Sequence, residues 1–552
     1  MKIDSEGGEM ERGQATTLFM GGQVLTMTEV GLVDAAVIRG NRIINVGTRR
    51  ECLDSVDRVD QVVDLEGHCL MPGFIDPHTH PIMMGQVRGW VDCSPERVSS
   101  IAEIVEVMRT AGENLPGELW LRGFGYEHRR LLDNRHPDRG DLDKVAIDRP
   151  VMLMNASGHG AAVNSFGLAN LGIDATVPDP EGGEIVRDAA GNPTGLLWDA
   201  ACDMLTGVHG IKVTNHGPNF HLDENPERMS EIFSVAQEEF LRAGITCVAD
   251  MQVTRREART YLAALSSGEM HIRVSMYYLS SQLHEITSLG LSTPFGDPHL
   301  RFQGVKLYAD GSLGAWTAYF PQGYQSDPCN HGHLYHDEGE YRDLMVEAIN
   351  NGLQTATHAQ SPEAIQFVMN ALKDKRITSD VATGRHRIEH CGLPTDAQIA
   401  EMSSLGVVPV VQPQHNFQFG DSTVEAIGAL GERYNPLGLY ERAGVPVVLS
   451  SDAPVATPNP LAAVRAAHER LTSTGRRLGG TELAVSVGTA LLGYTRNAAW
   501  AIGREAEVGM LEKGKLADFA VLEQNPLAED AFTAGNPKVL QTWTGGENVF
   551  SL

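Results

Sequence analysis

The stretch Met71-Pro-Gly-Phe-Ile-Asp-Pro-His-Thr-His80 decides the fold of this chain. Pro72 leads into apolar residues typical of a buried strand, and Pro77 removes a ladder hydrogen bond where the strand has to end. Side chains alternate along a strand, so His78 and His80 point to the same side and both imidazoles can reach one cation. A His-x-His pair is a weak signal in a chain with 20 histidines, but this pair follows a predicted strand.

Residues of the kind that bind metals recur downstream, each in or at the end of a short apolar segment. Barrels of alternating strands and helices place catalytic groups at the C-terminal ends of several strands, so this spacing predicts an α/β fold, a (β/α)8 barrel. Buried carboxylates and imidazoles that meet in one place indicate a metal ion. The segments are 304–311 with Lys306, 353–358 ending in His358, 386–390 ending in His390, and 445–452 ending in Asp452.

Five motifs are spread over nearly the whole chain: Met71-Pro-Gly-Phe-Ile-Asp-Pro-His-Thr-His80, Gly304-Val-Lys-Leu-Tyr-Ala-Asp-Gly-Ser312, Arg387-Ile-Glu-His390, Ser451-Asp-Ala-Pro-Val455 and Gly514-Lys-Leu-Ala-Asp-Phe519. Together they are highly specific. The chain resembles the amidohydrolase superfamily of metal-dependent hydrolases, and in particular its branch that includes N-substituted formamide deformylases.

The length predicts more than a bare barrel, because 552 residues exceed the usual barrel size of about 250 residues. Residues 16–70 show short alternating strands with turn signals, and with 505–552 they are expected to form a composite β-sandwich domain, as in the family resembled. The barrel is expected over 71–84 and 236–504. The segment 85–235 is too long for a crossover helix and is predicted to be an insertion that caps the barrel mouth.

Composition excludes several classes of protein. Hydrophobic residues make up 42% and charged residues 21%, which is ordinary for a globular protein with a large core. The net charge of -27 makes nucleic acid or an anionic membrane surface a poor partner, and we interpret the acidity as a source of solubility. No apolar run is long enough to span a bilayer, and the first residues lack the core of a secretion signal. We therefore expect a cytoplasmic protein.

The seven cysteines are scattered, without the close pairs of a zinc-thiolate site, so they are expected to be reduced, packed thiols. No phosphate-cradling glycine loop is found, so a nucleotide cofactor is not expected. A homodimer is the commonest closed assembly and is for that reason alone the expected one.

Lys306 bears on the number of metal ions. An ammonium group cannot ligate a cation, and its burial beside imidazoles is costly. In the family resembled, the lysine on this strand carries a carboxyl group from carbon dioxide, and the resulting carbamate bridges two divalent ions. The resemblance therefore implies a carbamate on Lys306 and a binuclear site. A plain Lys306 cation paired with Asp310 is the alternative.

The same resemblance implies a role for each ligand. His78, His80 and Asp452 would hold the more buried ion, while His358 and His390 would hold the second. Zinc is expected because hydrolysis needs no redox change, although manganese, iron or cobalt suits the same donors. A metal-bridging hydroxide would attack, and Asp452 would act as general acid/base and pass the proton to the departing nitrogen.

Four residues are candidates for contact with substrate. His159 lies in Ser157-Gly-His-Gly160, which resembles a family segment whose histidine can approach the reacting carbonyl; a purely structural histidine is the alternative. Asp310 and Gln412 follow predicted strands and should lie near the mouth. Trp316 could wall an apolar pocket, as could other aromatic residues, although such residues more often pack in a core. The other aromatic candidates are Trp90, Trp198 and Phe417.

Two departures from the family pattern bear on specificity. Ser361-Pro362 stands where relatives often have Gly-Asp, so that loop should be stiffer. Asp199 stands where relatives usually have glutamate, which leaves the role of that carboxylate open. No metal ligand is altered.

The leading hypothesis is a binuclear metal-dependent amidohydrolase that cleaves the C–N bond of a small-molecule amide, an N-substituted formamide or another N-acyl amine. A mononuclear deaminase, or an ester or lactone hydrolase of the same superfamily, is the alternative; the mononuclear site would leave Lys306 unmodified. A catalytically silent binding scaffold would have lost ligands, whereas all six remain. A serine hydrolase is disfavoured, because no Gly-x-Ser-x-Gly elbow surrounds Ser450 and Ser451.

Overall fold

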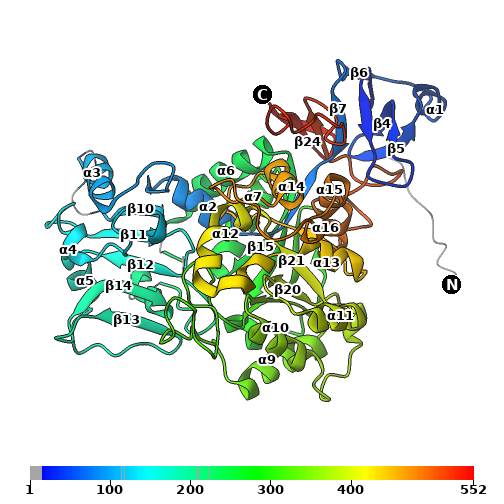
Figure 1. Ribbon diagram of the computed structural model, residues 1–552. Helices are drawn as coiled ribbons and strands as arrows, with labels where there is room; N and C mark the ends of the chain where they lie inside the picture. The colour runs from blue at the N-terminus through cyan, green and yellow to red at the C-terminus, as the bar shows by residue number, and fades with distance from the viewer. Residues whose placement is uncertain (1–14, 114, 117–118, 208–209, 220, 223) are drawn as a thin grey trace.

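The computed structural model describes residues 15–552 except 114, 117–118, 208–209, 220 and 223. A central barrel of strands and helices has one lobe on each side (Figure 1). One lobe is formed by residues between the first and second barrel strands, and the other by both ends of the chain. The first residues of the chain, in which no secretion signal is expected, lie outside the described residues.

The barrel is a parallel sheet that is nearly closed, which confirms the predicted α/β barrel. Its strands are buried on both faces, and this explains their continuous apolar runs. The ends of the path meet through backbone hydrogen bonds, from the Asp452 N–H to the His78 carbonyl and from the His80 N–H to the Ala453 carbonyl, each 2.9 Å. Among the described residues the barrel strands, in spatial order, are β8 (Phe74–Thr79), β15 (Ile245–Val253), β16 (Arg273–Leu279), β18 (Leu300–Tyr308), β19 (Gln354–Ala359), β20 (Arg387–His390), β21 (Val408–Val411) and β22 (Val448–Leu449); β17 (Phe295–Gly296) pairs with β18.

The last barrel strand is shorter than the apolar segment 445–452 suggested. Pro446 has no N–H to give to a ladder, so regular pairing begins after it. At the other end, Asp452 has a φ of 62°, which takes the chain out of the extended conformation. β20 ends in the same way, at His390 with a φ of 67°. Left-handed backbone at non-glycine residues is uncommon and concentrates at functional sites.

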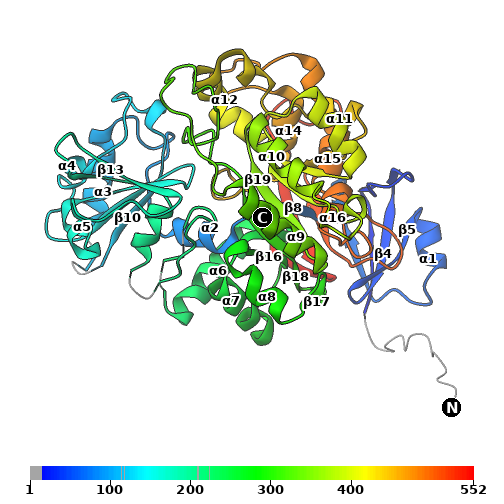
Figure 2. The same cartoon turned by 90° about the horizontal axis from the view of Figure 1, so that it is seen from below.

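Helices cover the outside of the barrel, as the view from below shows (Figure 2). Several begin at strong caps; Thr254 and Glu257 form a capping box at α7, for example. These helices are α2 (Pro81–Arg88), α6 (Pro226–Arg242), α7 (Arg255–Ser267), α8 (Leu283–Ser288), α9 (Glu338–Asn350), α10 (Pro362–Leu372), α11 (Asp396–Leu405), α12 (Gln414–Ile427), α13 (Leu437–Arg442), α14 (Pro460–Glu469), α15 (Val487–Gly493) and α16 (Arg496–Ala501).

The first lobe contains a six-stranded sheet in the order β13-β14-β12-β11-β10-β9, which we call the insertion sheet. β9, β10 and β11 are parallel, and the remaining pairs are antiparallel. The loop between β11 and β12 reaches the C-terminal ends of the barrel strands. The elements of this lobe are β9 (Val91–Asp92), α3 (Ile101–Gly112), β10 (Leu121–Tyr126), α4 (Arg139–Leu142), β11 (Val151–Asn155), β12 (Gly160–Val163), α5 (Ser165–Leu171), β13 (Gly183–Arg187) and β14 (Pro193–Asp199).

The second lobe combines both ends of the chain. β7 pairs with β23 in an antiparallel register that sets Leu70 opposite Val521, and Phe19 packs edge-on against Phe519 and Trp543. One sheet has the order β5-β4-β1-β6 and the other the order β25-β24-β23-β7-β2-β3. The elements are β1 (Thr16–Met20), β2 (Gln23–Leu25), β3 (Leu32–Val33), β4 (Ala35–Arg39), β5 (Arg42–Gly47), α1 (Arg49–Asp54), β6 (Gln61–Asp64), β7 (Cys69–Pro72), β23 (Phe519–Leu522), β24 (Val539–Thr544) and β25 (Glu547–Ser551).

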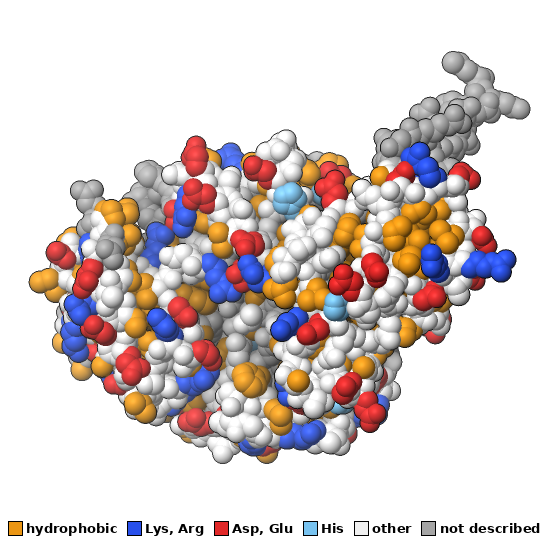
Figure 3. All heavy atoms as spheres, turned by 90° about the horizontal axis from the view of Figure 1, so that it is seen from above, with side chains coloured by type: hydrophobic (Ala, Val, Ile, Leu, Met, Phe, Trp, Pro, Cys, Tyr) orange, Lys and Arg blue, Asp and Glu red, His pale blue; other side chains and the backbone are white. Residues whose placement is uncertain are grey.

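We retain the division into a composite β-domain, a barrel and a capping insertion as a proposal. On the face seen in Figure 3, acidic and basic side chains are interspersed, and the surface is hollowed where the insertion lobe meets the barrel. Among the described residues, no helix combines the length and apolar character needed to cross a membrane.

Candidate metal centre

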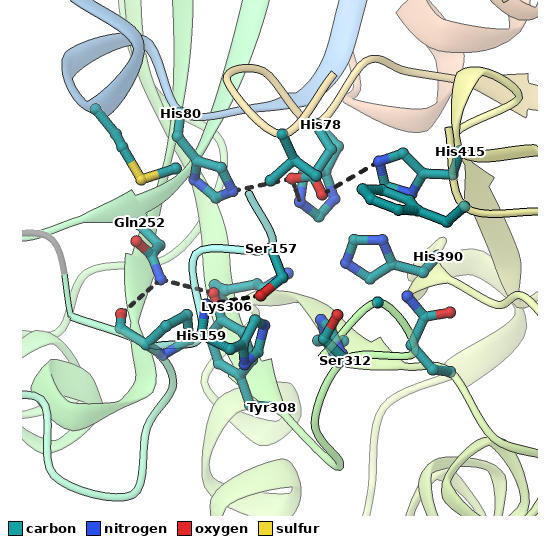
Figure 4. Close-up of a pocket in the computed structure, with 18 of the residues that line it drawn as sticks. His78, His80, Ser157, His159, Gln252, Lys306, Tyr308, Ser312, His390 and His415 are labelled. Carbon is teal, nitrogen blue, oxygen red and sulfur yellow. Dashed lines mark hydrogen bonds and ion pairs between the residues drawn. The ribbon is translucent and has the colours of Figure 1, made fainter. Parts of the chain in front are cut away.

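A small pocket of about 40 Å³ lies at the C-terminal ends of the barrel strands (Figure 4). The structure brings the side chains of all six predicted metal ligands into its lining. Residues from the insertion lobe and from α12 complete the wall. The lining includes His78, His80, Ser157, His159, Lys306, His358, His390, His415 and Asp452.

His78, His80 and Asp452 form one group that could hold a cation. The Nε2 atoms of both imidazoles lie 3.2 Å from Oδ1 of Asp452, and the three ligand atoms lie within 4.8 Å of one another. All three side chains are buried. Although burial opposes ionisation, His78 and His80 hold the pKa of Asp452 well below its usual range. The group therefore offers a carboxylate and two imidazoles at one point.

A second group joins Asp452 to His390 and to His415, which the sequence prediction did not include. His415 lies in the first turn of α12, with Nε2 3.8 Å from Oδ2 of Asp452 and without a hydrogen-bond partner. The sequence feature that could have identified His415 is its position four residues after β21, which places it at the same mouth of the barrel as the other candidate ligands.

His358 is close to these residues but differently oriented. Its ring centroid is 4.4 Å from that of His390, while its Nε2 donates to the Gly311 carbonyl at 2.9 Å. The free ring nitrogen is therefore Nδ1. Among the described residues, neither convergent group contains His358, so its assignment as a ligand of the second ion stays a prediction.

The ring of His78 is held from behind by a buried ion pair. Its Nδ1 donates to Glu389 at 2.5 Å, and Arg387 donates to the same carboxylate at 2.7 and 2.8 Å. Burial opposes ionisation of Glu389, but Arg387 and His78 lower its pKa to about 2. This contact leaves Nε2 of His78 for a metal, in the way that carboxylates orient metal-binding histidines.

Gln412 has the same relation to His390. Its Oε1 accepts from Nδ1 of His390 at 2.8 Å, and its amide donates to Ser450 at 2.8 Å. Gln412 thus lies behind the ring and leaves Nε2 of His390 for a metal. Contact of Gln412 with substrate stays a prediction.

Lys306 is fully buried at the base of the pocket. Its Nζ has no hydrogen-bond partner among the described residues and lies 4.7 Å from the centre of the Tyr308 ring. Burial lowers its pKa to about 8. Asp310, the alternative ionic partner, instead accepts backbone N–H groups from Tyr319, Gln360 and Ser361. A buried amine without a partner is costly, so Lys306 is the feature of the pocket that most needs an explanation.

The donor set fits a divalent metal ion. Burial lowers the pKa values of His80 and His415 to about 4, and it lowers those of His358 and His390 well below the usual range. Metal ligation requires neutral imidazoles, which these environments favour at neutral pH. Nδ1 of His80, Nε2 of His415 and Nζ of Lys306 are buried without hydrogen-bond partners. Imidazole and carboxylate donors of this kind are suited to zinc.

His159 enters the pocket from the insertion lobe, and its ring centroid is 5.7 Å from that of His358. Its Nδ1 donates to Asp199 at 2.7 Å, and the Tyr335 hydroxyl donates to the same oxygen at 2.5 Å. Asp199 has a φ of 47°, again in the left-handed region. The role of Asp199, which the sequence left open, is thus to hold His159.

Asp310 and Trp316 are not among the residues described in the pocket lining. Trp316 stacks on Tyr324 with an interplanar angle of 8°, and the Arg129 guanidinium lies 4.1 Å from its ring centre. Both side chains make contacts with neighbouring loops near the mouth. Their contact with substrate stays a prediction.

A nearly closed α/β barrel with buried histidines and an aspartate at its strand ends defines a class of metal-dependent enzymes. Residues 61–550 match the model of the amidohydrolase family, and the chain belongs to that family. The predicted resemblance is confirmed. The protein is therefore an enzyme, a metal-dependent hydrolase.

Individual relatives are similar to most of the chain. The chain is 31% identical to the N-substituted formamide deformylase of Arthrobacter pascens over 88% of both sequences. It is 29% identical to the protein LONG AFTER FAR-RED 3 of Arabidopsis thaliana over 91% of this chain and 86% of that one. Among solved structures, it is similar to an uncharacterised metal-dependent hydrolase from Pyrococcus horikoshii, with a TM-score of 0.74, 25% identity, and coverage of 93% and 98% of the two chains.

Proposed function

We propose that this protein hydrolyses the C–N bond of a small-molecule amide, which is an N-substituted formamide or another N-acyl amine. We also propose that it uses two divalent metal ions, and that these are zinc because imidazole and carboxylate donors suit that metal. The observation that carries the proposal is the buried, unpartnered Nζ of Lys306 in a pocket with histidine and aspartate donors. A carboxyl group on Nζ would convert this amine into an anion suited to bridging two cations.

In this proposal His78, His80 and Asp452 would hold one ion, and His390 would hold the second together with His358 or His415. A carboxylated Lys306 would supply an anionic donor to both. When bound, such a pair of ions acidifies a water molecule and polarises the carbonyl of the substrate.

The protein's own residues then handle the proton. The Asp452 carboxylate accepts it from the attacking water and returns it to the departing nitrogen, since an amine leaves poorly unless it is protonated. His159 lies across the pocket, and its contact with Asp199 leaves Nε2 as the ring nitrogen available to substrate. Glu389 keeps His78 oriented throughout.

The sizes of two cavities support a formamide in particular. The metal pocket of about 40 Å³ has room for a few water-sized groups, so it suits a small acyl group. A neighbouring cavity of about 900 Å³ suits a large N-substituent, because ligand pockets have volumes of about 300–1,000 Å³. The name of the Arthrobacter pascens relative describes the same combination.

Metal analysis and one lysine variant test the proposal. The protein, purified without chelator, should contain two divalent ions per chain and should release formate from N-benzylformamide. Lys306→Ala should lose metal and activity, and short carboxylic acids should restore part of both. Lys144→Ala, which changes an exposed lysine of the insertion lobe, should behave as wild type.

The other outcomes contradict the proposal in distinct ways. One ion per chain that survives Lys306→Ala would indicate a mononuclear hydrolase with an unmodified lysine. No metal and no hydrolysis would leave the binding scaffold as the remaining alternative. Metal with hydrolysis of esters but not of amides would contradict the C–N specificity.

A further inference from the structure

The larger cavity, of about 900 Å³, opens directly beside the metal pocket. Phe419 and Val455 line both cavities. Ser157 lines the small pocket, and its neighbour in the chain, Ala156, lines the large cavity. The large cavity lies between the insertion sheet and helices α12 and α14, where the surface in Figure 3 is hollowed. It therefore adjoins the candidate metal centre.

Aromatic side chains from the insertion lobe and from barrel helix α12 line this cavity. Trp90 and Phe124 come from the insertion lobe, and Phe417 and Phe419 come from α12. Phe417 lines the cavity and remains 49% exposed. Aromatic walls favour a flat ring between them.

The charged groups of the cavity are paired, with one exception. Each arginine in the lining has an acidic partner, and Asp92 accepts the Ser94 backbone N–H at 2.9 Å. The arginine pairs are Arg88 with Glu239 at 2.8 Å, Arg130 with Glu96 at 3.3 Å, and Arg465 with Glu469 at 3.0 Å.

Glu127 is the exception. It is only 6% exposed and lines the cavity, yet among the described residues its carboxylate has neither a hydrogen bond nor an ion pair. Burial raises its pKa to about 7, although the charge of Arg130 opposes the shift. Gln418 and Asn536 each add a buried side-chain oxygen to the lining, again without a partner. Among the described residues, the wall therefore presents several acceptor oxygens without a hydrogen-bond partner.

We propose that this cavity binds the amine-side substituent of the substrate, and that the substituent carries an aromatic ring and a second, positively charged nitrogen that pairs with the Glu127 carboxylate. The inference rests on the proposed function for the position of the scissile amide. The substrate class is then a mono-N-formyl aromatic diamine, and hydrolysis adds water across the C–N bond to release formate and the diamine. Phe417 provides a ring to which such a cation is also attracted.

Direct binding tests the charge preference without relying on catalysis. Calorimetry on the metal-loaded protein would compare 4-methylbenzylamine, a cation, with 4-methylbenzyl alcohol, its neutral counterpart. Wild type should bind the amine about 10-fold more tightly or better, as a hydrogen bond to a charged group allows. Glu127→Gln should remove this preference, and Glu469→Gln, which alters a paired carboxylate of the same cavity, should keep it.

Equal affinity for the amine and the alcohol in wild type would overturn the inference, whether or not the variant folds. An unchanged preference in Glu127→Gln would overturn it as well.

Kinetics separates this inference from the proposed function. N-Benzylformamides with a para aminomethyl, ethyl or carboxymethyl group should differ in kcat/KM in favour of the cation. Equal hydrolysis of all three would refute the charge preference alone, and hydrolysis of none, with the charge preference intact, would refute the proposed amide hydrolysis alone.

Discussion

At the scale of single residues, the site depends on groups that orient the ligands from behind. Glu389 fixes His78 through a 2.5 Å contact while Arg387 holds Glu389. Glu389→Gln should weaken metal binding by about 10- to 100-fold, as loss of such a supporting contact typically does. Competition with a chromogenic chelator would measure the affinity. Glu363→Gln, in the exposed first turn of α10, is the matched control and should leave it unchanged. Equal affinities in the three proteins would contradict the orienting role.

The sequence predicted residues that line the pocket better than the residues that hold them from behind. His78, His80, Lys306, His390 and Asp452 could be found because each lies in a recognisable motif in or after a strand, and the structure places them in one pocket. Roles that depend on side-chain direction could not be found in this way. The contact of Gln412 with His390 was not predicted, and its contact with substrate stays a prediction. His415 was not expected because it belongs to a helix outside the recognised motifs.

At the scale of elements, Asp76 and Ser451 join the first and last barrel strands. The Ser451 backbone N–H donates to Asp76 at 3.1 Å, and its hydroxyl donates to the same carboxylate. Ser451→Ala should keep hydrolytic activity and lower the free energy of unfolding by about 1–3 kcal/mol, because it leaves a buried carboxylate oxygen without its donor. Urea unfolding would measure this, with Ser404→Ala, at the exposed end of α11, as control. A folded Ser451→Ala protein devoid of activity would instead indicate a chemical role.

A buried carboxylate also connects β15 to α7. Tyr261 donates to Asp250 at 2.5 Å, and burial raises the pKa of Asp250 from 3.8 to about 7. Between these values the folded protein binds a proton that the unfolded chain has released, so stability falls as pH rises from about 4 to about 7. The unfolding free energy of Asp250→Asn should therefore decline less steeply over this range than that of wild type. Parallel pH profiles from urea titrations would contradict the assignment.

At the scale of the whole molecule, the barrel was predictable because short apolar segments that end in metal-binding residue types recur along the chain. The internal sheet of the insertion lobe was not. Its strands come from residues 91–199 with mixed parallel and antiparallel pairing, which a sequence pattern does not specify. The cavity between that lobe and the barrel depends on how the two pack, and its lining therefore became visible only in the structure.

Metal binding should couple the site to the stability of the entire barrel. The donors come from β8, β20, α12 and the turn after β22, so a bound ion joins elements far apart in the sequence and stabilises the folded state over the unfolded chain. Removal of metal with a chelator should lower the melting temperature, and added zinc should restore it. At a free concentration 100 times the dissociation constant, one ion contributes about 2.7 kcal/mol. The melting temperature of His78→Ala should respond less to zinc than that of wild type, whereas His284→Ala, which changes an exposed histidine on α8, should respond as wild type does. A melting temperature of wild type that does not change with zinc or chelator would show that the histidine and aspartate donors do not hold an ion in the folded protein.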